Sequence, residues 1–448
     1  MQSFCKNNRR YLYAAVGFVL LLFLGLIYSW SVFIGPLEAD FGWERSQTSS
    51  IFTISILFFW LGNVASGFTS ERLSPRATIL IAAACAVAGF AASSFTTSLP
   101  WIYVSYGVLC GFAVGMGSNG VLSCVLGWFP GRQGIASGAL MMGIGLGSLV
   151  LGPVVTSLLG SVGWRGAFLA LAVAFGALMV VGALILRAPE RQSNMVETTL
   201  KDSRRTTEQN APARALERAE SETREFTAPE MLRTRAFWTF MLWAVLIGTG
   251  GLALISNAVP AAQDVLLGSM DEAAALMTAT MAMGSISAFN GFGRLASGFL
   301  WDRKGCRFVT VLISSVYAVS MAACAFGAAT GTFAAVVAGF IALGTAYGAS
   351  IATTSAMIGS VFGQRHYGMN YACALANMVL AACIGPTISG AVHASTGSYF
   401  AAYAVFFALA VASAVVALWM RVPHRAAKQK NAPLSPAKAA RSDAGASR

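Results

Sequence analysis

The chain has 448 residues, of which 56% are apolar and only 11% are charged. A soluble domain carries about a quarter charged residues, so this composition excludes an ordinary soluble protein and predicts a polytopic membrane protein. The formal net charge of +12 does not indicate nucleic-acid binding, because nearly all Lys and Arg residues fall in the termini, a central segment and alternate loops.

Long apolar runs in the first half of the chain predict six membrane helices, each near the ~20 residues that a helix needs to cross a bilayer. The predicted spans are about 11–35, 47–69, 77–97, 101–127, 134–160 and 164–186. Residues 1–10 are therefore a basic N-terminal segment, and residues 11–187 are the predicted N-terminal six-helix bundle.

The second half begins after a segment of different composition. Residues 188–236 mix acidic and basic residues with few large apolar ones, which predicts a linker rather than a span. Further apolar runs predict a C-terminal six-helix bundle over 237–421, with spans at about 237–262, 273–300, 308–328, 333–361, 369–392 and 398–420. Residues 422–448 form a basic tail.

The basic residues also predict the orientation in the membrane. Only Arg45 and Arg165 lie in the loops opposite to those rich in Lys and Arg. By the positive-inside rule both termini, the linker and the tail are expected in the cytoplasm, with the protein in the inner or plasma membrane. The basic balance therefore reflects topology and contact with the lipid bilayer.

An internal repeat relates the two predicted bundles. The pattern Gly67-x-x-x-Glu71-Arg72-x-Ser74-x-Arg76 recurs 231 residues later as Gly298-x-x-x-Asp302-Arg303-x-Gly305-x-Arg307. Gly152-Pro153 recurs as Gly385-Pro386, 233 residues later, and the sequences that precede the fifth and eleventh spans are related by the same offset. The predicted fold class is therefore an all-α membrane protein whose twelve helices form two bundles related by a parallel repeat. This is a transporter architecture, with a binding site expected near the midplane between the halves.

Arg294 is the main candidate for a binding residue. It lies inside the predicted span 273–300, well before the charged exit at Asp302, and no predicted span offers a carboxylate to pair with it. A buried guanidinium is costly in lipid and marks a functional site by default, so a substrate anion is the simplest partner. Two structural alternatives remain, namely snorkelling toward the exit and pairing with Asn290 one turn earlier.

Three other polar residues within spans are weaker candidates. Tyr28, in the polar second half of the first span, can line a pocket or belong to an interfacial aromatic belt. Ser118 and Asn119 can contribute to a site, but isolated polar groups more often hydrogen-bond a neighbouring helix.

An enzyme is not predicted. The eight Cys residues lack paired spacing, and the three His residues, His366, His393 and His424, are isolated. The pattern therefore predicts no metal site, no cofactor and no nucleophile motif.

The repeated acidic-Arg loop resembles the signature loop of the major facilitator superfamily, and this resemblance extends over all twelve helices. More narrowly, the chain resembles the oxalate–formate antiporter family and the related monocarboxylate transporters. The residues that carry this resemblance are Tyr28-Ser29-Trp30, Trp128-Phe129-Pro130 with Gly134-x-Ala136-Ser137-Gly138, Glu230-Met231-Leu232-Arg233-Thr234 with Phe237-Trp238, Asn257-x-Val259-Pro260, and Phe289-Asn290-Gly291-x-x-Arg294-x-x-x-Gly298.

The resemblance implies roles for several residues. Arg294 would contact the substrate carboxylate, and Tyr28 would be a pocket aromatic. Tyr347 and Tyr371 fall near further pocket aromatics, while Ser118 replaces another. The oxalate carrier has a second cation, a lysine in the eleventh helix, where this chain has Ala374; the span 369–392 contains no Lys or Arg. This difference favours a monovalent anion over oxalate.

The two loop motifs are interpreted as gates, because their Arg residues can hold helix ends and carboxylates together in one conformer and release them in the other. The predicted gating residues are Gly67, Glu71, Arg72, Arg76, Gly298, Asp302, Arg303 and Arg307.

We therefore expect a secondary active transporter of a small organic anion, a monocarboxylate being favoured, that works as a monomer by alternating access. Exchange against a counter-anion and symport with protons both remain open, as do the substrate and the direction of flux. The alternatives are a transporter of neutral or amphipathic compounds and a non-transporting membrane sensor or partner subunit.

Overall fold

The computed structural model describes residues 2–188, 225–266, 270–396 and 399–420. Within these ranges the side chains of residues 2–8 and of several single positions, Tyr28 and Glu71 among them, lie outside the described part. Most of the predicted linker and all of the predicted tail also lie outside the described residues, so the predicted domain boundaries remain predictions.

The described part of the chain is helical throughout. The N-terminal half contains α1 (Gln2–Leu24), η1 (Gly25–Ser29), α2 (Ser31–Phe41), α3 (Arg45–Arg72), α4 (Pro75–Ser94), α5 (Leu99–Ile102), η2 (Tyr103–Cys110), α6 (Gly111–Leu126) and α7 (Gln133–Ile185). The C-terminal half contains α10 (Ala228–Leu232), α11 (Arg235–Leu266), α12 (Glu272–Thr330), α13 (Phe333–Met357), η3 (Ile358–Phe362), α14 (Tyr367–Ala374), α15 (Ala376–Thr396) and α16 (Tyr399–Trp419).

Ten helices among the described residues are long and apolar enough to cross a membrane. Two of them, α7 and α12, each join two spans across a kink at a glycine with positive φ, namely Gly163 (φ 68°) and Gly305 (φ 78°). A residue with a side chain rarely adopts this conformation, so glycine allows the chain to turn back there without a loop. Counting each of these helices as two spans gives the predicted twelve.

Two predicted spans differ from the observed helices. The first, expected at 11–35, is part of a longer run in which α1 gives way to the 3₁₀ turn η1, and α2 continues to Phe41. At this turn Gly25 packs against the backbone of Ile144 in α7, where a Cβ would not fit. The eleventh predicted span, 369–392, consists of two helices, α14 and α15, which meet at Leu375.

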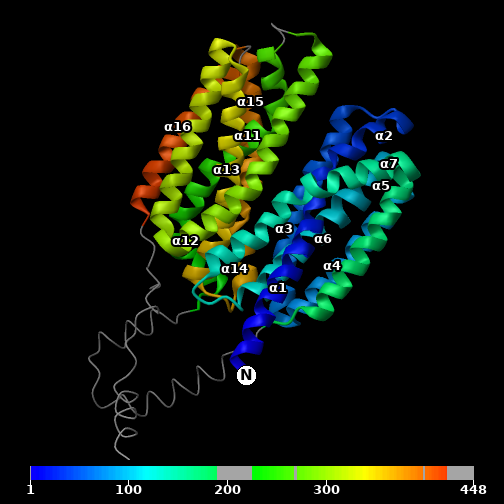
Figure 1. Ribbon diagram of the computed structural model, residues 1–448, viewed down its shortest axis with the longest axis vertical. Coiled ribbons are helices and arrows are strands. Elements are labelled where there is room, and N and C mark those ends of the chain that lie inside the picture. The colour runs from blue at the N-terminus through cyan, green and yellow to red at the C-terminus, as the bar shows by residue number, and fades with distance from the viewer. Residues whose placement is uncertain (1, 189–224, 267–269, 397–398, 421–448) are drawn as a thin grey trace, which may run out of the picture.

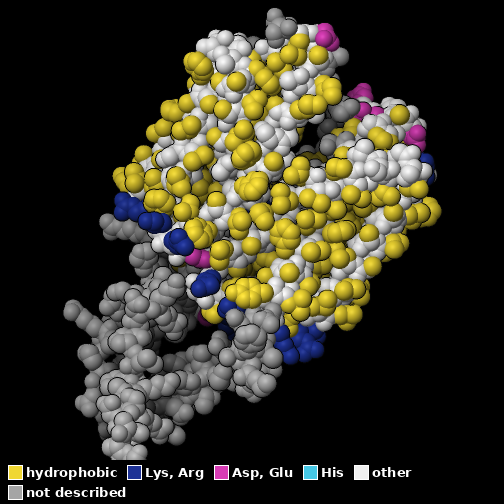
Figure 2. Space-filling model, viewed as in Figure 1, with side chains coloured by type: hydrophobic (Ala, Val, Ile, Leu, Met, Phe, Trp, Pro, Cys, Tyr) yellow, Lys and Arg dark blue, Asp and Glu magenta, His cyan; other side chains and the backbone are white. Residues whose placement is uncertain are grey.

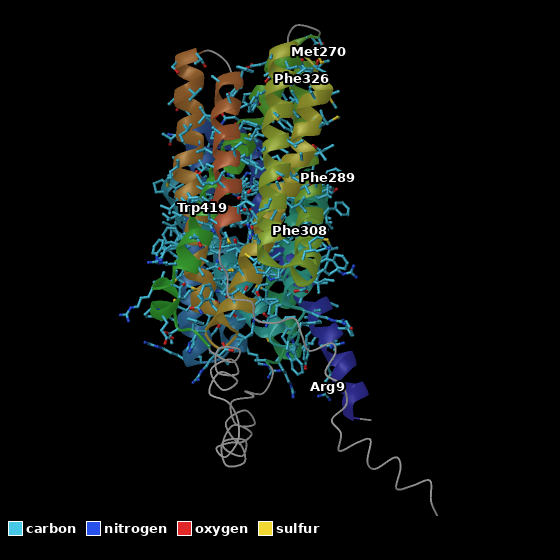
Figure 3. All side chains as sticks on the ribbon, turned by 90° about the vertical axis from the view of Figure 1, so that its left-hand side faces the viewer. Arg9, Met270, Phe289, Phe308, Phe326 and Trp419 are labelled. Carbon is cyan, nitrogen blue, oxygen red and sulfur yellow. The ribbon has the colours of Figure 1, made fainter. Side chains whose placement is uncertain are left out.

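The helices form two bundles that lie side by side (Figure 1). Between the bundles, α7 contacts α12 and α13, while α3 contacts α14 and α15. Exposed Arg and Lys side chains gather at the end that carries Arg9, whereas Met270 lies at the opposite end (Figures 2 and 3). We call these the basic end, with Arg72, Arg303, Lys304 and Arg307, and the acidic end, with Asp40, Glu44 and Asp271.

Candidate functional site

The Arg294 guanidinium joins the two bundles. Arg294 is 3% exposed and is the only charged residue in the buried class among the residues that the structure describes. Its Nε donates to Oδ1 of Asn290 at 2.8 Å, and its Nη1 donates to the main-chain oxygen of Met141 at 2.9 Å. Because Met141 belongs to α7 and Arg294 to α12, this buried cation lies at the interface between the halves.

These contacts disagree with the snorkelling alternative, in which the Arg294 side chain would extend toward the charged exit at Asp302. Asn290 is one turn back from Arg294, in the direction away from the basic end. The carboxylate at that end is engaged elsewhere, since Asp302 accepts from the amides of Gly134 and Ile135 at 2.9 and 2.8 Å. The guanidinium is therefore held at depth between the bundles rather than directed to the surface.

Small residues on α7 make this close approach possible. A Cβ on Gly145 would lie 3.3 Å from both Arg294 Nε and Asn290 Oδ1, and one on Gly138 would lie 3.3 Å from the Cα atoms of Leu295 and Gly298. Such glycines allow the backbones of membrane helices to approach closely. As a result, a carbonyl of α7 comes within hydrogen-bond distance of a side chain on α12.

The three candidate tyrosines occupy different places. The Tyr371 hydroxyl on α14 lies 3.9 Å from Sδ of Met141, the residue whose carbonyl accepts from Arg294. Tyr347 lies on α13, where its ring packs on Gly251 of α11 and lines a recess in the C-terminal bundle. The backbone of Tyr28 is in η1, but its side chain lies outside the described part.

Ser118 and Asn119 have different partners although they are adjacent on α6. The Ser118 hydroxyl donates to the carbonyl of Gly115 within its own helix. The Asn119 amide donates to the carbonyls of Asn63 on α3 and Gly368 on α14, both at 2.9 Å. Asn119 is thus a fully buried link between the bundles, while a contact of either residue with a ligand stays a prediction.

Asn119→Ala is expected to weaken the closed arrangement of the basic end by removing the hydrogen bond to Gly368, which is the one of the two that joins the bundles. This bond contributes about 1 kcal/mol, so the closed conformer should lose about fivefold in population. The measurement is labelling of an introduced cysteine, Ser123→Cys, by a membrane-impermeant maleimide added at the basic end. Ser118→Ala is the matched control for closure, since its hydroxyl bonds only within α6. Unchanged labelling in Asn119→Ala would contradict this role.

The predicted gating glycines form two related contacts between the bundles. A Cβ on Gly67 of α3 would lie 2.8 Å from the Cα of Met369 on α14. A Cβ on Gly298 of α12 would lie 2.8 Å from the carbonyl carbon of Gly134 on α7. The repeated motif therefore contributes one close backbone contact from each half.

The charged gating residues differ in how they are held. Asp302 binds the first turn of α7, where the unpaired amides and the helix dipole favour a carboxylate. Arg76 donates to the carbonyls of Leu186 and Leu184 at 2.7 and 2.9 Å, at the end of α7. Arg303 lies over the ring of Phe299 at 4.0 Å. Arg72 and Arg307 are exposed, and the Glu71 side chain lies outside the described part.

These contacts describe a single conformer. Toward the basic end, α3 and α6 of the N-terminal bundle contact α14 of the C-terminal bundle, and α7 contacts α12. At the acidic end the bundles diverge (Figure 1), and the space-filling view shows a hollow between them there (Figure 2). The structure is therefore closed at the basic end and parted at the acidic end.

Sequence reasoning missed three residues, two of them at the interface between the bundles and one inside the C-terminal bundle. Trp60 of α3 donates from Nε1 to the carbonyl of Ala372 on α14 at 3.2 Å, although the sequence shows only an aromatic in an apolar run. Met141 contributes its carbonyl, for which no side-chain signal exists. Asn377 lines the recess beside Tyr347; it is an isolated polar residue in an apolar span, the same signal that drew attention to Asn119.

A family model described as the Major Facilitator Superfamily matches residues 14–369 and 289–445. The chain is 26% identical over 421 residues to the oxalate:formate antiporter of Oxalobacter formigenes, and the alignment covers 93% of this chain and 93% of that protein. It is 27% identical over 350 residues to the uncharacterized MFS-type transporter YhjX of Escherichia coli (strain K12), covering 78% of this chain and 79% of that protein. Over 180 residues it is 31% identical to monocarboxylate transporter 12 of Mus musculus, an alignment that covers 40% of this chain and 35% of that protein.

Two solved structures share the arrangement of the helices. The proton:xylose symporter XylE, bound to 6-bromo-6-deoxy-D-glucose, superposes with a TM-score of 0.66 at 15% identity and covers 94% of this chain and 96% of that one. FucP in the outward conformation superposes with a TM-score of 0.65 at 13% identity, and the superposition covers 92% of this chain and 99% of that one. The predicted twelve-helix fold in two bundles is thereby confirmed.

Proposed function

The chain belongs to the Major Facilitator Superfamily of membrane transporters, and we propose that it carries a small monovalent organic anion, a monocarboxylate, by alternating access. The observation that carries this proposal is the buried guanidinium of Arg294, held between the bundles by Asn290 and the carbonyl of Met141. A cation at this depth is retained in membrane proteins where it serves transport or ligand binding.

The charge of the substrate follows from what surrounds this cation. A dicarboxylate is best neutralised by two cations, and the position in α14 where the resemblance places the second one is occupied by Ala374, which is buried. No Lys or Arg occurs in α14 or α15. The relatives named an oxalate:formate antiporter and monocarboxylate transporters agree with a carboxylate as the substrate, and the single cation favours one carboxylate at a time.

The mechanism we infer begins with the observed conformer. We assign the basic end to the cytoplasm by the positive-inside rule, so the parted acidic end would admit the anion from outside. In the opposite conformer α7 would separate from α12 and α3 from α14 near the cytoplasm. Asp302 would then leave the amides of Gly134 and Ile135, and Arg294 would leave Met141.

A bound carboxylate would lower the barrier between these conformers. When the acidic end closes, Arg294 loses access to water, which is unfavourable for a charge that is not neutralised. A carboxylate compensates this charge and stabilises the occluded state, so the carrier with bound anion changes conformation more readily than the empty carrier. This favours exchange of anions, or symport in which a proton accompanies the substrate.

The experiment is uptake into proteoliposomes of labelled formate, lactate, pyruvate and oxalate, with and without an internal anion. We expect saturable uptake of at least one monocarboxylate, stimulated by an internal monocarboxylate or an inward proton gradient, with oxalate the weakest competitor. Uptake inhibited only by uncharged or amphipathic compounds would indicate the first alternative, a carrier of neutral compounds. Saturable binding without flux would indicate a sensor, and either result would contradict the proposal.

A further inference from the structure

The described part of the predicted linker begins with a segment that binds the C-terminal bundle, which we call the linker clip (residues 225–227). The amide of Phe226 donates to the carbonyl of Phe362 at 3.0 Å, and the two rings meet edge to face with their centroids 5.5 Å apart. The carbonyl of Phe226 accepts from Nδ2 of Asn370 at 2.9 Å. Both main-chain groups and the side chain of Phe226 are therefore held by the bundle.

Glu225 fastens the clip to the turn that precedes α14. Its Oε2 accepts from the main-chain amide of Arg365 at 3.0 Å. Gly363, in the same turn, has φ 98°, and a Cβ there would overlap the Glu225 carboxylate. Glycine adopts this conformation without strain and leaves room for the carboxylate. The turn is thus shaped to receive Glu225, and the charge of the acceptor strengthens the bond.

The short helix α10 holds the clip from its other side. Oε2 of Glu230 accepts from the amide of Thr227 at 2.8 Å and from its hydroxyl at 2.9 Å, which fixes Thr227 as the N-cap of α10. Nε1 of Trp238 in α11 donates to the carbonyl of Leu232 at the end of α10, at 2.7 Å. The clip is therefore tied both to α11 and to the start of α14.

The internal repeat does not account for this clip. Phe129 and Phe362 are equivalent positions, 233 residues apart. The ring of Phe129 packs against Tyr11 of α1, and the ring of Phe362 packs in the same way against Phe237 of α11, with centroids 6.3 and 6.5 Å apart. Phe226 adds a further ring on Phe362. The clip is thus an addition to the repeated fold, on the C-terminal half.

The clip lies next to the contacts that close the basic end. Asn370, which binds the clip, is two residues from Gly368, whose carbonyl accepts from Asn119 of α6. Between them Met369 packs against Gly67 of α3. The clip therefore holds the part of α14 that meets the N-terminal bundle.

The position of α14 depends on such fastening because this helix is short. It has eight residues and is separated from α15 by the interruption at Leu375. Its start is also held by α13, through a 2.7 Å hydrogen bond between the hydroxyls of Tyr367 and Ser355. A segment that is already ordered loses less conformational entropy when it makes a contact, so each fastening favours the closed conformer.

We propose that the linker clip positions α14 for closure of the basic end, with Glu225 and Phe226 as the positioning residues of this gate. With the clip in place, α14 presents Gly368 and Met369 to the N-terminal bundle. When the clip is released, α14 moves independently of α15, and the closed conformer loses population. Because Glu225 continues directly into the linker, the linker controls access at the basic end, whichever anion is carried.

The test measures labelling of Ser123→Cys by an impermeant maleimide added at the basic end, without substrate. Ser123 lies 3.2 Å from the position of a Cβ on Gly368, so it reports the contact between α6 and α14. Phe226→Ala and Glu225→Ala should each be labelled about fivefold faster than the Ser123→Cys parent, the change expected for one ring pair or one hydrogen bond. The contacts described for both residues lie in the C-terminal bundle, so this effect has to pass through α14.

Two controls separate this role from a general loosening of the bundle. Phe226→Tyr keeps the ring, so its labelling should stay within about twofold of the parent. Phe326→Ala removes an exposed ring of α12 near the opposite end (Figure 3) and should be labelled at the rate of the parent. The double variant Glu225→Ala/Phe226→Ala should be labelled at about the rate of the faster single variant, because both substitutions release one clip.

Three results would overturn the proposal. They are labelling at the parent rate in either Phe226→Ala or Glu225→Ala, multiplication of the two single effects in the double variant, and an equally large increase in Phe326→Ala. Since no substrate is present in this experiment, none of these results alters the proposed function, which the uptake experiment tests separately.

Discussion

Replacing Arg294 by alanine should lower kcat/KM for monocarboxylate uptake by about a hundredfold or more. Truncating one partner of a buried, hydrogen-bonded charge pair costs about 2–5 kcal/mol, and no other charged residue is in the buried class among the described residues. Arg294→Lys keeps the charge but loses the planar fork that matches a carboxylate, so a loss of about tenfold is expected. The measurement is initial uptake rate against substrate concentration in proteoliposomes.

Arg165→Ala is the control for this effect. Arg165 lies at the acidic end, where it is half exposed and pairs with Asp40 at 3.5 Å. Exposed pairs contribute little, so uptake should stay within about twofold of the wild type. If Arg294→Ala and Arg294→Lys both keep the wild-type rate and KM, the guanidinium does not bind the substrate.

Gly298→Val should abolish transport by preventing closure of the basic end. A Cβ at this position would lie 2.8 Å from the carbonyl carbon of Gly134 and 3.1 Å from the Cα of Gly138, both of them backbone atoms. Overpacking of this kind costs about 3 kcal/mol, which shifts the ratio of conformers about a hundredfold. A carrier that cannot close one end cannot complete its cycle.

Closure can be measured directly with an introduced cysteine. The Ser123 hydroxyl lies between the bundles, 3.2 Å from the position of a Cβ on Gly368. In Gly298→Val, Ser123→Cys should react with an impermeant maleimide from the basic end much faster than in the parent, with the labelling of the native cysteines subtracted. Gly284→Val is the matched control, because it lies on the same helix and its Cβ would meet nothing within 4 Å. Wild-type uptake in Gly298→Val would refute the close contact as a gate.

The sequence predicted the twelve spans well because hydropathy over about 20 residues decides whether a helix crosses the bilayer. It predicted less well where tertiary contact overrides this signal. The 3₁₀ turn at Gly25 forms beside the backbone of Ile144, and the interruption at Leu375 divides a run that is predominantly apolar. A hydropathy average records neither event.

The same limit applies to the candidate site. Arg294 was evident because an isolated charge in an apolar run has a high energetic cost, and its pairing with Asn290 follows from their spacing on one helix face. Its second contact is a backbone carbonyl of the opposite bundle, which no residue type reveals. Asn119 shows a related ambiguity, since an isolated amide can bind a ligand or another helix, and here it bonds to Asn63 and Gly368.

Equilibrium binding of a labelled monocarboxylate to the purified protein tests the central claim most directly, because it separates recognition by Arg294 from movement of the bundles. The substrate is the monocarboxylate with the fastest uptake, and folding of each variant is checked by its thermal unfolding. We predict one bound anion per chain in the wild type and in Gly298→Val, and loss of saturable binding in a folded Arg294→Ala. Binding of wild-type affinity and stoichiometry in Arg294→Ala would contradict the account.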